Sequence, residues 1–288
     1  MKFFPVFFIT VMTAVTLQAA PKKLLMVTTT TSFRHTSIPN LEKVVEQLGK
    51  TSGEFTVDFV RQPPGEPQRP KQDASDEEKA AYNSARAVWL ETLRGELNKL
   101  SLESLMNYDG VVFASTTGDL PIPDMQGLID WIKAGHSFIG IHAASDTFHR
   151  SPEFFDMLGG EFEHHGPQVG VEYVNQEPKH PATAYLGNKW SVQKEEIYQF
   201  KHYDPAKVTD LLIFDKNPET NAPGHFPASW CKQFGAGKVF YTAIGHREDI
   251  IDASPDLKDR RNPVETSLAY QKHVLGGIEW TLGLAQDK

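Results

Sequence analysis

The sequence contains very little cysteine, because Cys231 is the only one among its 288 residues. A single cysteine excludes an intrachain disulfide, so the fold must be stabilised by core burial or by a metal. Cys231 lies inside an apolar stretch, and we expect it to be an inert thiol of the core.

Positive charge is also scarce. The chain has 29 Lys and Arg against 37 Asp and Glu, which gives a formal net charge of −8. No run of basic residues offers a track for phosphate groups, so we expect neither nucleic acid nor an anionic membrane surface as a partner. The remaining composition, 40% hydrophobic and 23% charged, is ordinary for a globular protein with a real core.

The one long apolar stretch lies at the N-terminus. Lys2 is followed by apolar residues 3–17 and then by Gln-Ala-Ala at 18–20, which is the layout of a secretory signal peptide. This stretch is shorter than the ~20 residues that a membrane span needs. We therefore expect residues 1–20 to be a signal peptide and residues 21–288 to be exported to the periplasm or the cell exterior without a membrane span.

Segments typical of strands alternate with segments typical of helices. The expected strands are 23–28, 55–60, 108–114, 137–141, 210–214, 228–233 and 238–243. Between them, apolar residues recur at helical spacing from Ile122 to Ile132, and Leu268 to Leu282 mark a closing helix. This order predicts a three-layer α/β fold with a mostly parallel sheet and helices on both faces. Ligands of such sheets bind beyond the carboxyl ends of the strands.

Residues 61–100 interrupt the alternation. They begin with the Pro-rich stretch RQPPGEPQRPKQ and continue through a capping box at 75–78 into a polar helix that we expect to end near Arg94. We interpret them as an inserted linker and surface helix within one domain, residues 21–288. An arm that docks a partner is the alternative.

Polar clusters follow several of the expected strands. They contain the imidazoles and carboxylates of His35, Asp119, His142, Asp146 and His246. Because parallel strands end at one edge of a sheet, these side chains are expected to share a cleft. A lone histidine after a strand is more often structural, but three at one edge favour a functional site.

The histidines suggest two kinds of chemistry. His142 and His246, with one of His35, His164 or His165, would supply three ligands to a metal and leave a position for water or substrate. No HExxH spacing is present, and general acid/base catalysis by His142 and His246 without a metal is the alternative. Tyr198 and later aromatic residues near Glu195 and Glu196 suit the faces of sugar rings, although ordinary packing explains each of them singly.

Five motifs together resemble a known family. In chain order they are FRHTSIP, STTGD, GIHAASDT, EEIYQF and KVFYTAIGH. They resemble the ThuA-like (trehalose-utilisation) family, whose fold is of the class I glutamine amidotransferase-like, flavodoxin-like type, over roughly Lys22 to Leu284. In that superfamily the turn after the fourth strand carries a cysteine nucleophile, and a His-x-Glu pair completes a triad. His142 takes the nucleophile position here, so the resemblance implies the fold without glutaminase activity.

The sequence departs from the family pattern in two places. The insertion at 61–100 is longer than usual, and GHFPASW differs in spacing from the family's His-Pro-x-x-Trp, so we leave His225 out of the site. The segment His246-Arg247-Glu248 resembles the His-x-Glu pair. The family is linked to disaccharide catabolism, and its members often occur with sugar oxidoreductases, which implies a small-molecule carbohydrate as the partner.

We therefore expect an exported hydrolase, lyase or isomerase that acts on a disaccharide or keto-sugar. A divalent metal such as zinc is the expected cofactor, and no nucleotide cofactor is expected. The sequence does not decide whether the protein forms a homo-oligomer. The expected metal ligands are His142, His165 and His246. The expected catalytic residues are His142, Asp146, His246, Glu196 and His35. The expected substrate-binding residues are Arg34, Thr117, Gly118, Asp119 and Tyr198, with Thr117 and Gly118 as oxyanion donors. A non-catalytic sugar-binding protein and a partner-dependent protein are the alternatives.

Overall fold

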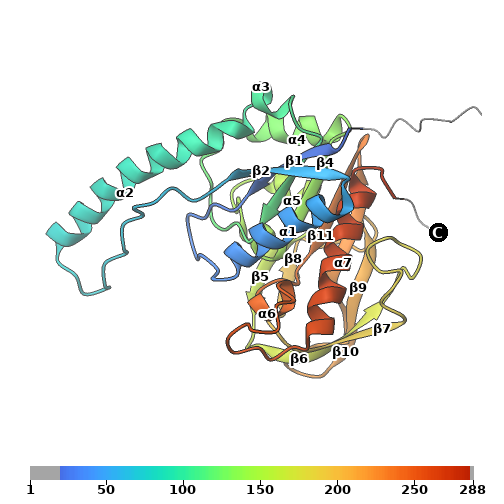
Figure 1. Cartoon of the computed structure of the whole chain (residues 1–288). Helices are drawn as coiled ribbons and strands as arrows, with labels where there is room; N and C mark the ends of the chain where they lie inside the picture. The colour runs from blue at the N-terminus through green and yellow to red at the C-terminus, as the bar shows by residue number, and fades with distance from the viewer. Residues whose placement is uncertain (1–19, 286–288) are drawn as a thin grey trace, which may run out of the picture.

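Nine strands form the central sheet of the computed structural model, which describes residues 20–285 (Figure 1). Five neighbouring strands pair in parallel, and they carry the loops of interest: β2 (Phe55–Val60), β1 (Lys22–Val27), β3 (Gly110–Ala114), β4 (Ser137–Ile141) and β11 (Gly237–Thr242). The sheet continues through antiparallel pairs in the order β10 (Pro223–Phe234), β9 (Thr209–Lys216), β6 (Val169–Asn175) and β7 (Lys189–Glu195). Among the nine strands, β10 and β6 run against the others, so the predicted mostly parallel sheet is confirmed.

Helices cover both faces of the sheet. One face carries α1 (Ile38–Ser52), α6 (Glu248–Ile251) and α7 (Val264–Thr281). The other face carries α2 (Asp76–Leu97), α3 (Leu102–Leu105), α4 (Met125–Lys133) and α5 (Pro152–Leu158). Leu24 and Met26 of β1 join the first apolar cluster, whereas Leu25 and Val27 join the second. This period of two is why a strand buried on both faces is apolar throughout.

The expected strands all fall on observed strands, but four observed strands were not expected. β6 and β7 extend the sheet, while β5 (Glu161–His165) and β8 (Tyr198–Lys201) form a separate two-stranded sheet. β5 has a single apolar residue, Phe162, among acids and histidines, so its sequence gives no strand signal. The predicted closing helix is observed as α7; Leu268 on it is exposed, whereas Tyr270 and Val274 are buried.

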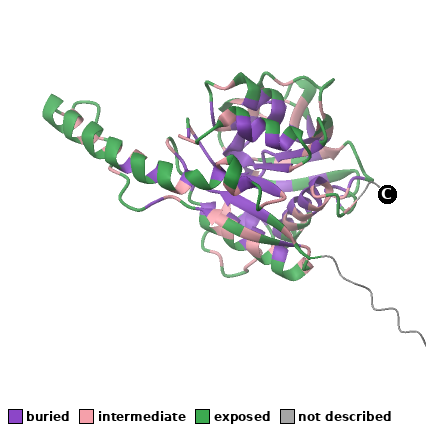
Figure 2. Ribbon diagram, turned by 90° about the horizontal axis from the view of Figure 1, so that it is seen from above, coloured by how far each residue is buried: buried purple, intermediate pink, exposed green. Residues whose placement is uncertain are grey.

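The insertion forms an arm that projects from the body of the molecule (Figure 1). The predicted capping box is present: the Ser75 hydroxyl accepts a hydrogen bond from the backbone N–H of Glu78, and the Glu78 carboxylate accepts one from the backbone of Ser75. The helix ends at Leu97, beyond the predicted end. Its outer turns are exposed (Figure 2), and its buried residues, Trp89, Leu93 and Leu97, lie in its inner half.

The predicted signal peptide lies at residues 1–20, of which 1–19 are outside the described residues. Within residues 20–285, no helix combines the length and the apolar character that crossing a membrane requires.

Candidate functional site

The turn after β4 holds His142 in an unusual backbone conformation. His142 begins a short 3-10 helix, η2 (His142–Asp146), and its φ of +50° lies in the left-handed region that few residues adopt. The Tyr241 hydroxyl donates a hydrogen bond of 2.8 Å to the His142 carbonyl and supports this turn. The His142 side chain is fully buried, and its Nδ1 lies 2.7 Å from the carbonyl oxygen of Ala243. That carbonyl accepts the Nδ1 proton, so Nε2 presents its lone pair on the other side of the ring.

Two further histidines meet the His142 ring. His35, in the loop after β1, places its Nε2 3.2 Å from Nε2 of His142. His246, in the loop after β11, has its ring centroid 5.3 Å from both the His35 and the His142 centroids. These loops follow strands that point the same way in the sheet. The structure thus brings together the three histidines that the strand order placed at one edge.

Glu196, between β7 and β8, lies among the three imidazoles. Its Oε2 is 3.0 Å from Nδ1 of His246 and 3.6 Å from Nε2 of His142. One donor atom from each of four residues lies within 4.8 Å of the others, and we call this set the His/Glu cluster: His35, His142, Glu196 and His246. The Tyr198 hydroxyl, 3.1 Å from Nε2 of His142, borders the cluster.

Burial and the charges of the neighbouring groups shift the pKa values of the four residues in different ways. Burial, with the neighbouring imidazoles, lowers the pKa of His142 well below its usual value and that of His35 to about 4. Burial also acts to lower the pKa of His246, but the Glu196 carboxylate outweighs it and the pKa is raised. Burial acts to raise the pKa of Glu196, but hydrogen bonding to His246 and the nearby imidazoles lower it. A charged His246–Glu196 pair therefore lies beside two neutral imidazoles.

The His/Glu cluster has the chemistry of a metal site. Zinc and similar divalent ions take imidazole nitrogens and carboxylate oxygens, and they bind the neutral imidazole that His35 and His142 provide. The Nδ1 contact of His142 with the Ala243 carbonyl is the outer hydrogen bond typical of ligating histidines. His165, the third ligand expected from the sequence, lies outside the cluster. It is half exposed, with Nδ1 3.2 Å from Oε1 of Glu196, and His35 and Glu196 occupy the positions beside His142 and His246.

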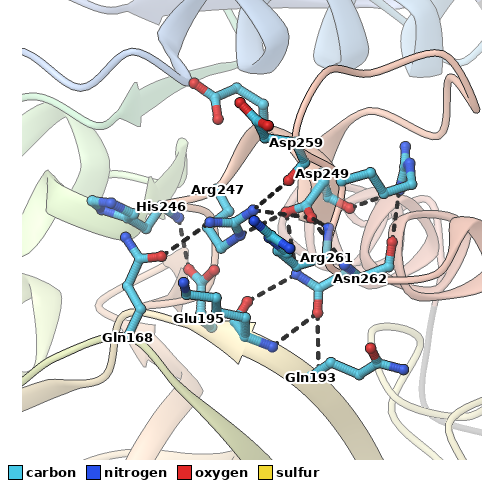
Figure 3. Close-up of polar contacts among 12 residues, drawn as sticks. Gln168, Gln193, Glu195, His246, Arg247, Asp249, Asp259, Arg261 and Asn262 are labelled. Atoms are coloured by element: carbon cyan, nitrogen blue, oxygen red, sulfur yellow. Dashed lines mark hydrogen bonds and ion pairs between the residues drawn. The ribbon is translucent and has the colours of Figure 1, made fainter.

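A polar network holds the His246 loop in place (Figure 3). The fully buried Glu195 accepts hydrogen bonds from the backbone N–H groups of Gly245, at 3.0 Å, and His246, at 2.7 Å. Burial nevertheless raises the pKa of Glu195 to about 7. Arg247 donates to the buried Asp249, at 2.8 Å from Nε, and to Gln168, at 3.1 Å. Asp249 also accepts hydrogen bonds from the backbone N–H groups of Arg261 and Asn262, which the order of the strands does not predict.

The His-x-Glu pair suggested by the resemblance does not form. The Glu248 carboxylate accepts a hydrogen bond from the Thr36 hydroxyl, near the start of α1. Glu196, from a different part of the chain, provides the carboxylate that contacts the His246 ring.

Four of the expected substrate-binding residues lie outside the His/Glu cluster. Asp119 is exposed and pairs with Arg150 at 3.2 Å. The Arg34 guanidinium donates to the Thr28 carbonyl at 2.8 Å. The Thr117 hydroxyl donates to the Phe33 carbonyl at 2.7 Å, and the Gly118 N–H, expected as an oxyanion donor, donates to the Asp146 carbonyl at 2.8 Å.

Asp146 also points to other partners. Its carboxylate lies 2.9 Å from Nε2 of His149, whose Nδ1 is 2.8 Å from the buried Glu161. Glu161 in turn contacts Lys201, the last residue of β8, and His202, which follows it. Asp146 therefore belongs to a second ionic network beside the His/Glu cluster. His164, the third histidine considered as a ligand, is exposed at 3.8 Å from the Glu163 carboxylate.

Comparison with known proteins identifies the family of the chain. The ThuA family model, described as trehalose utilisation, matches residues 23–281. A ThuA-like protein from Parabacteroides merdae is similar in structure at a TM-score of 0.62 and 20% identity, covering 93% of this chain and 92% of that one. A ThuA-like protein from Bacteroides uniformis is similar at a TM-score of 0.57 and 17% identity, covering 96% and 97%. These two likenesses show a shared fold. No curated protein matches the sequence. The chain belongs to the ThuA family.

Proposed function

We propose that this ThuA family protein is an exported, metal-dependent enzyme that acts on a disaccharide or keto-sugar. The observation that carries the proposal is the convergence of three imidazoles and one carboxylate within 4.8 Å, drawn from four separate loops. The family description, trehalose utilisation, supports a carbohydrate as substrate. The N-terminal residues 1–20, with the composition of a signal peptide, support export.

The residues of the His/Glu cluster can bind a metal or transfer a proton. A divalent ion such as zinc, if bound there, would acidify a water molecule or polarise a sugar carbonyl. His35 and His142, both neutral, would hold the ion together with Glu196 and His246. The His246 side chain is 20% exposed, whereas that of His142 is fully buried, so His246 is the more accessible of the two. In the alternative without a metal, the His246–Glu196 pair can hold or transfer a proton. Activation of water or of a carbonyl in this way is compatible with hydrolase, lyase or isomerase chemistry.

Metal content tests the site directly. The purified mature protein should contain close to one equivalent of a divalent metal, measured by inductively coupled plasma mass spectrometry. His142→Ala should lose it, because the substitution removes a central donor. His225→Ala is the matched control: His225 is an accessible histidine paired with Asp210 at 2.7 Å, outside the cluster. Equal metal content in the two variants would contradict the site.

Turnover tests the enzymatic part. Trehalose, other disaccharides and their 3-keto forms are incubated with the metal-loaded protein, and products are followed by chromatography. We expect conversion of at least one substrate and its loss in His142→Ala and His246→Ala. Binding without turnover, surviving both substitutions, would support the non-catalytic sugar-binding alternative.

A further inference from the structure

A cleft of about 700 Å³ opens between the inserted arm and the loop after β1. Its lining includes Phe33 from that loop, Glu66 and Arg69 from the linker, and Tyr82 and Arg86 from α2. The arm thus makes one wall of the cleft, and the loop that leads into His35 makes the other. Figure 1 shows the arm leaving the body at this loop.

Hydrogen bonds fix the two walls relative to each other. The Gln62 side chain accepts from the Thr30 N–H at 2.8 Å and donates to the Thr30 carbonyl at 3.2 Å. The Arg86 guanidinium donates to the Thr31 carbonyl at 2.8 Å. At the base of the arm, the Trp89 indole N–H donates to the Pro63 carbonyl at 3.3 Å. The cleft is therefore preformed, which is the condition for binding a small ligand without a large ordering cost.

Phe33 connects the cleft to the His/Glu cluster. Phe33 lines the cleft and is 62% exposed, and its ring lies edge-on to the His35 ring at a centroid distance of 4.8 Å. The Thr117 hydroxyl holds the Phe33 carbonyl. A ligand stacked on Phe33 therefore lies one side chain away from His35.

We propose that this cleft is a sugar subsite, which binds a second sugar unit of a substrate whose reacting unit lies at the His/Glu cluster. The proposal rests on the proposed function, and it defines the substrate as a disaccharide or longer glycan. Phe33 and Tyr82 supply ring faces that suit sugar rings. Glu66, Gln68 and Arg69 supply donors and acceptors for hydroxyl groups.

The lining carries groups of both charges, which can hydrogen-bond the hydroxyl groups of a sugar. Arg86 already donates to a backbone carbonyl, and the Glu66 carboxylate accompanies Arg69 in the lining. The volume of about 700 Å³ lies within the ~300–1,000 Å³ range of small-molecule sites. The insertion thereby becomes a specificity element for the length of the glycan.

Calorimetry on the metal-loaded mature protein tests the subsite. Trehalose, maltose and cellobiose are titrated alongside glucose, and at least one disaccharide should bind ~10-fold or more tightly than glucose. Tyr82→Ala should abolish this difference and leave glucose affinity and metal content unchanged. Tyr82→Phe keeps the ring and should keep most of the difference. Val88→Ala is the control, because Val88 is 70% exposed on the same helix and does not line the cleft.

The outcomes separate the subsite from the proposed function. Equal affinity for glucose and all three disaccharides, or an unchanged disaccharide preference in Tyr82→Ala, overturns the subsite even if metal and turnover are present. A preference that disappears in Tyr82→Ala, in a protein that lacks metal and turnover, supports the cleft and overturns the enzyme. Circular dichroism of Tyr82→Ala, compared with Val88→Ala, shows that α2 is intact.

Discussion

At the scale of single residues, Tyr198 borders the His/Glu cluster without belonging to the metal-binding set. Its hydroxyl lies 3.1 Å from Nε2 of His142, and its ring packs against Phe162 at a centroid distance of 4.4 Å. Burial, with the charge of Glu196, raises its pKa well above the usual value. The phenol therefore stays protonated at neutral pH and can act as a donor at the border of the cluster.

Tyr198→Phe should separate catalysis from metal binding. The substitution keeps the ring contacts and removes one hydrogen bond, so unfolding free energy should fall by only about 1 kcal/mol. Metal content should stay the same, while turnover should fall by a factor on the order of 100, as for a lost proton donor. Elemental analysis and steady-state kinetics measure the two effects. Unchanged turnover would assign Tyr198 to packing alone.

The residues of the site were only partly predictable. The convergence of His35, His142 and His246 follows from strand order, because each lies in a loop after a strand of the parallel part of the sheet. Glu196 was expected as a catalytic residue, but its contact with the imidazoles does not follow from strand order. It lies between β7 and β8, two strands that the sequence pattern left unrecognised. Nor does the sequence show that Asp119 turns outward to Arg150, because that depends on the local path of its loop.

At the scale of elements, α2 is stabilised by different forces along its length. Its inner half packs through Trp89, Leu93 and Leu97, whereas its outer turns are exposed (Figure 2). The outer turns depend on the capping box of Ser75 and Glu78 and on the acidic residues in the first turn. An isolated helix of this kind is marginal in water, so its start is the weak point.

Ser75→Ala should therefore unfold the outer turns locally. Removal of the cap costs about 1 kcal/mol, and the loss should appear in hydrogen exchange of residues 76–82 rather than in the melting temperature. Ser84→Ala is the matched control, because the Ser84 hydroxyl only donates to the Ala80 carbonyl within the helix. Equal protection of residues 76–82 in the two variants would contradict the role of the cap.

The predictability of elements follows burial. The inner parallel strands are buried on both faces, so their sequences are apolar runs that are easy to recognise. The capping box likewise predicts the start of α2. β5 to β8 expose polar residues on part of their surface and lie between irregular connections, so their sequences resemble loops. The part of the fold that carries Glu196 and Tyr198 is thus the part that periodicity describes least well.

At the scale of the whole molecule, an acidic pair joins the last helix to the region between α1 and β2. Glu279 of α7 lies beside Glu54, whose Oε2 is buried without a hydrogen-bond partner among the described residues. Burial and the charge of Glu54 raise the pKa of Glu279 to about 7, from an ordinary value of 4.5. Between these values the folded protein retains a proton that the unfolded chain releases, so this pair makes stability fall as pH rises.

Glu279→Gln should therefore stabilise the protein in a pH-dependent way. Near pH 5 the wild-type carboxyl is protonated in the folded state, so the variant should melt close to the wild type. At pH 8 the variant avoids two adjacent carboxylates, and its melting temperature should exceed that of the wild type on the order of 2 °C. Glu265→Gln, at an exposed position in the same helix, should shift the melting temperature equally at both pH values. Calorimetric scans at pH 5 and 8 measure the difference, and parallel pH profiles for Glu279→Gln and the wild type would show that the pair does not titrate on unfolding.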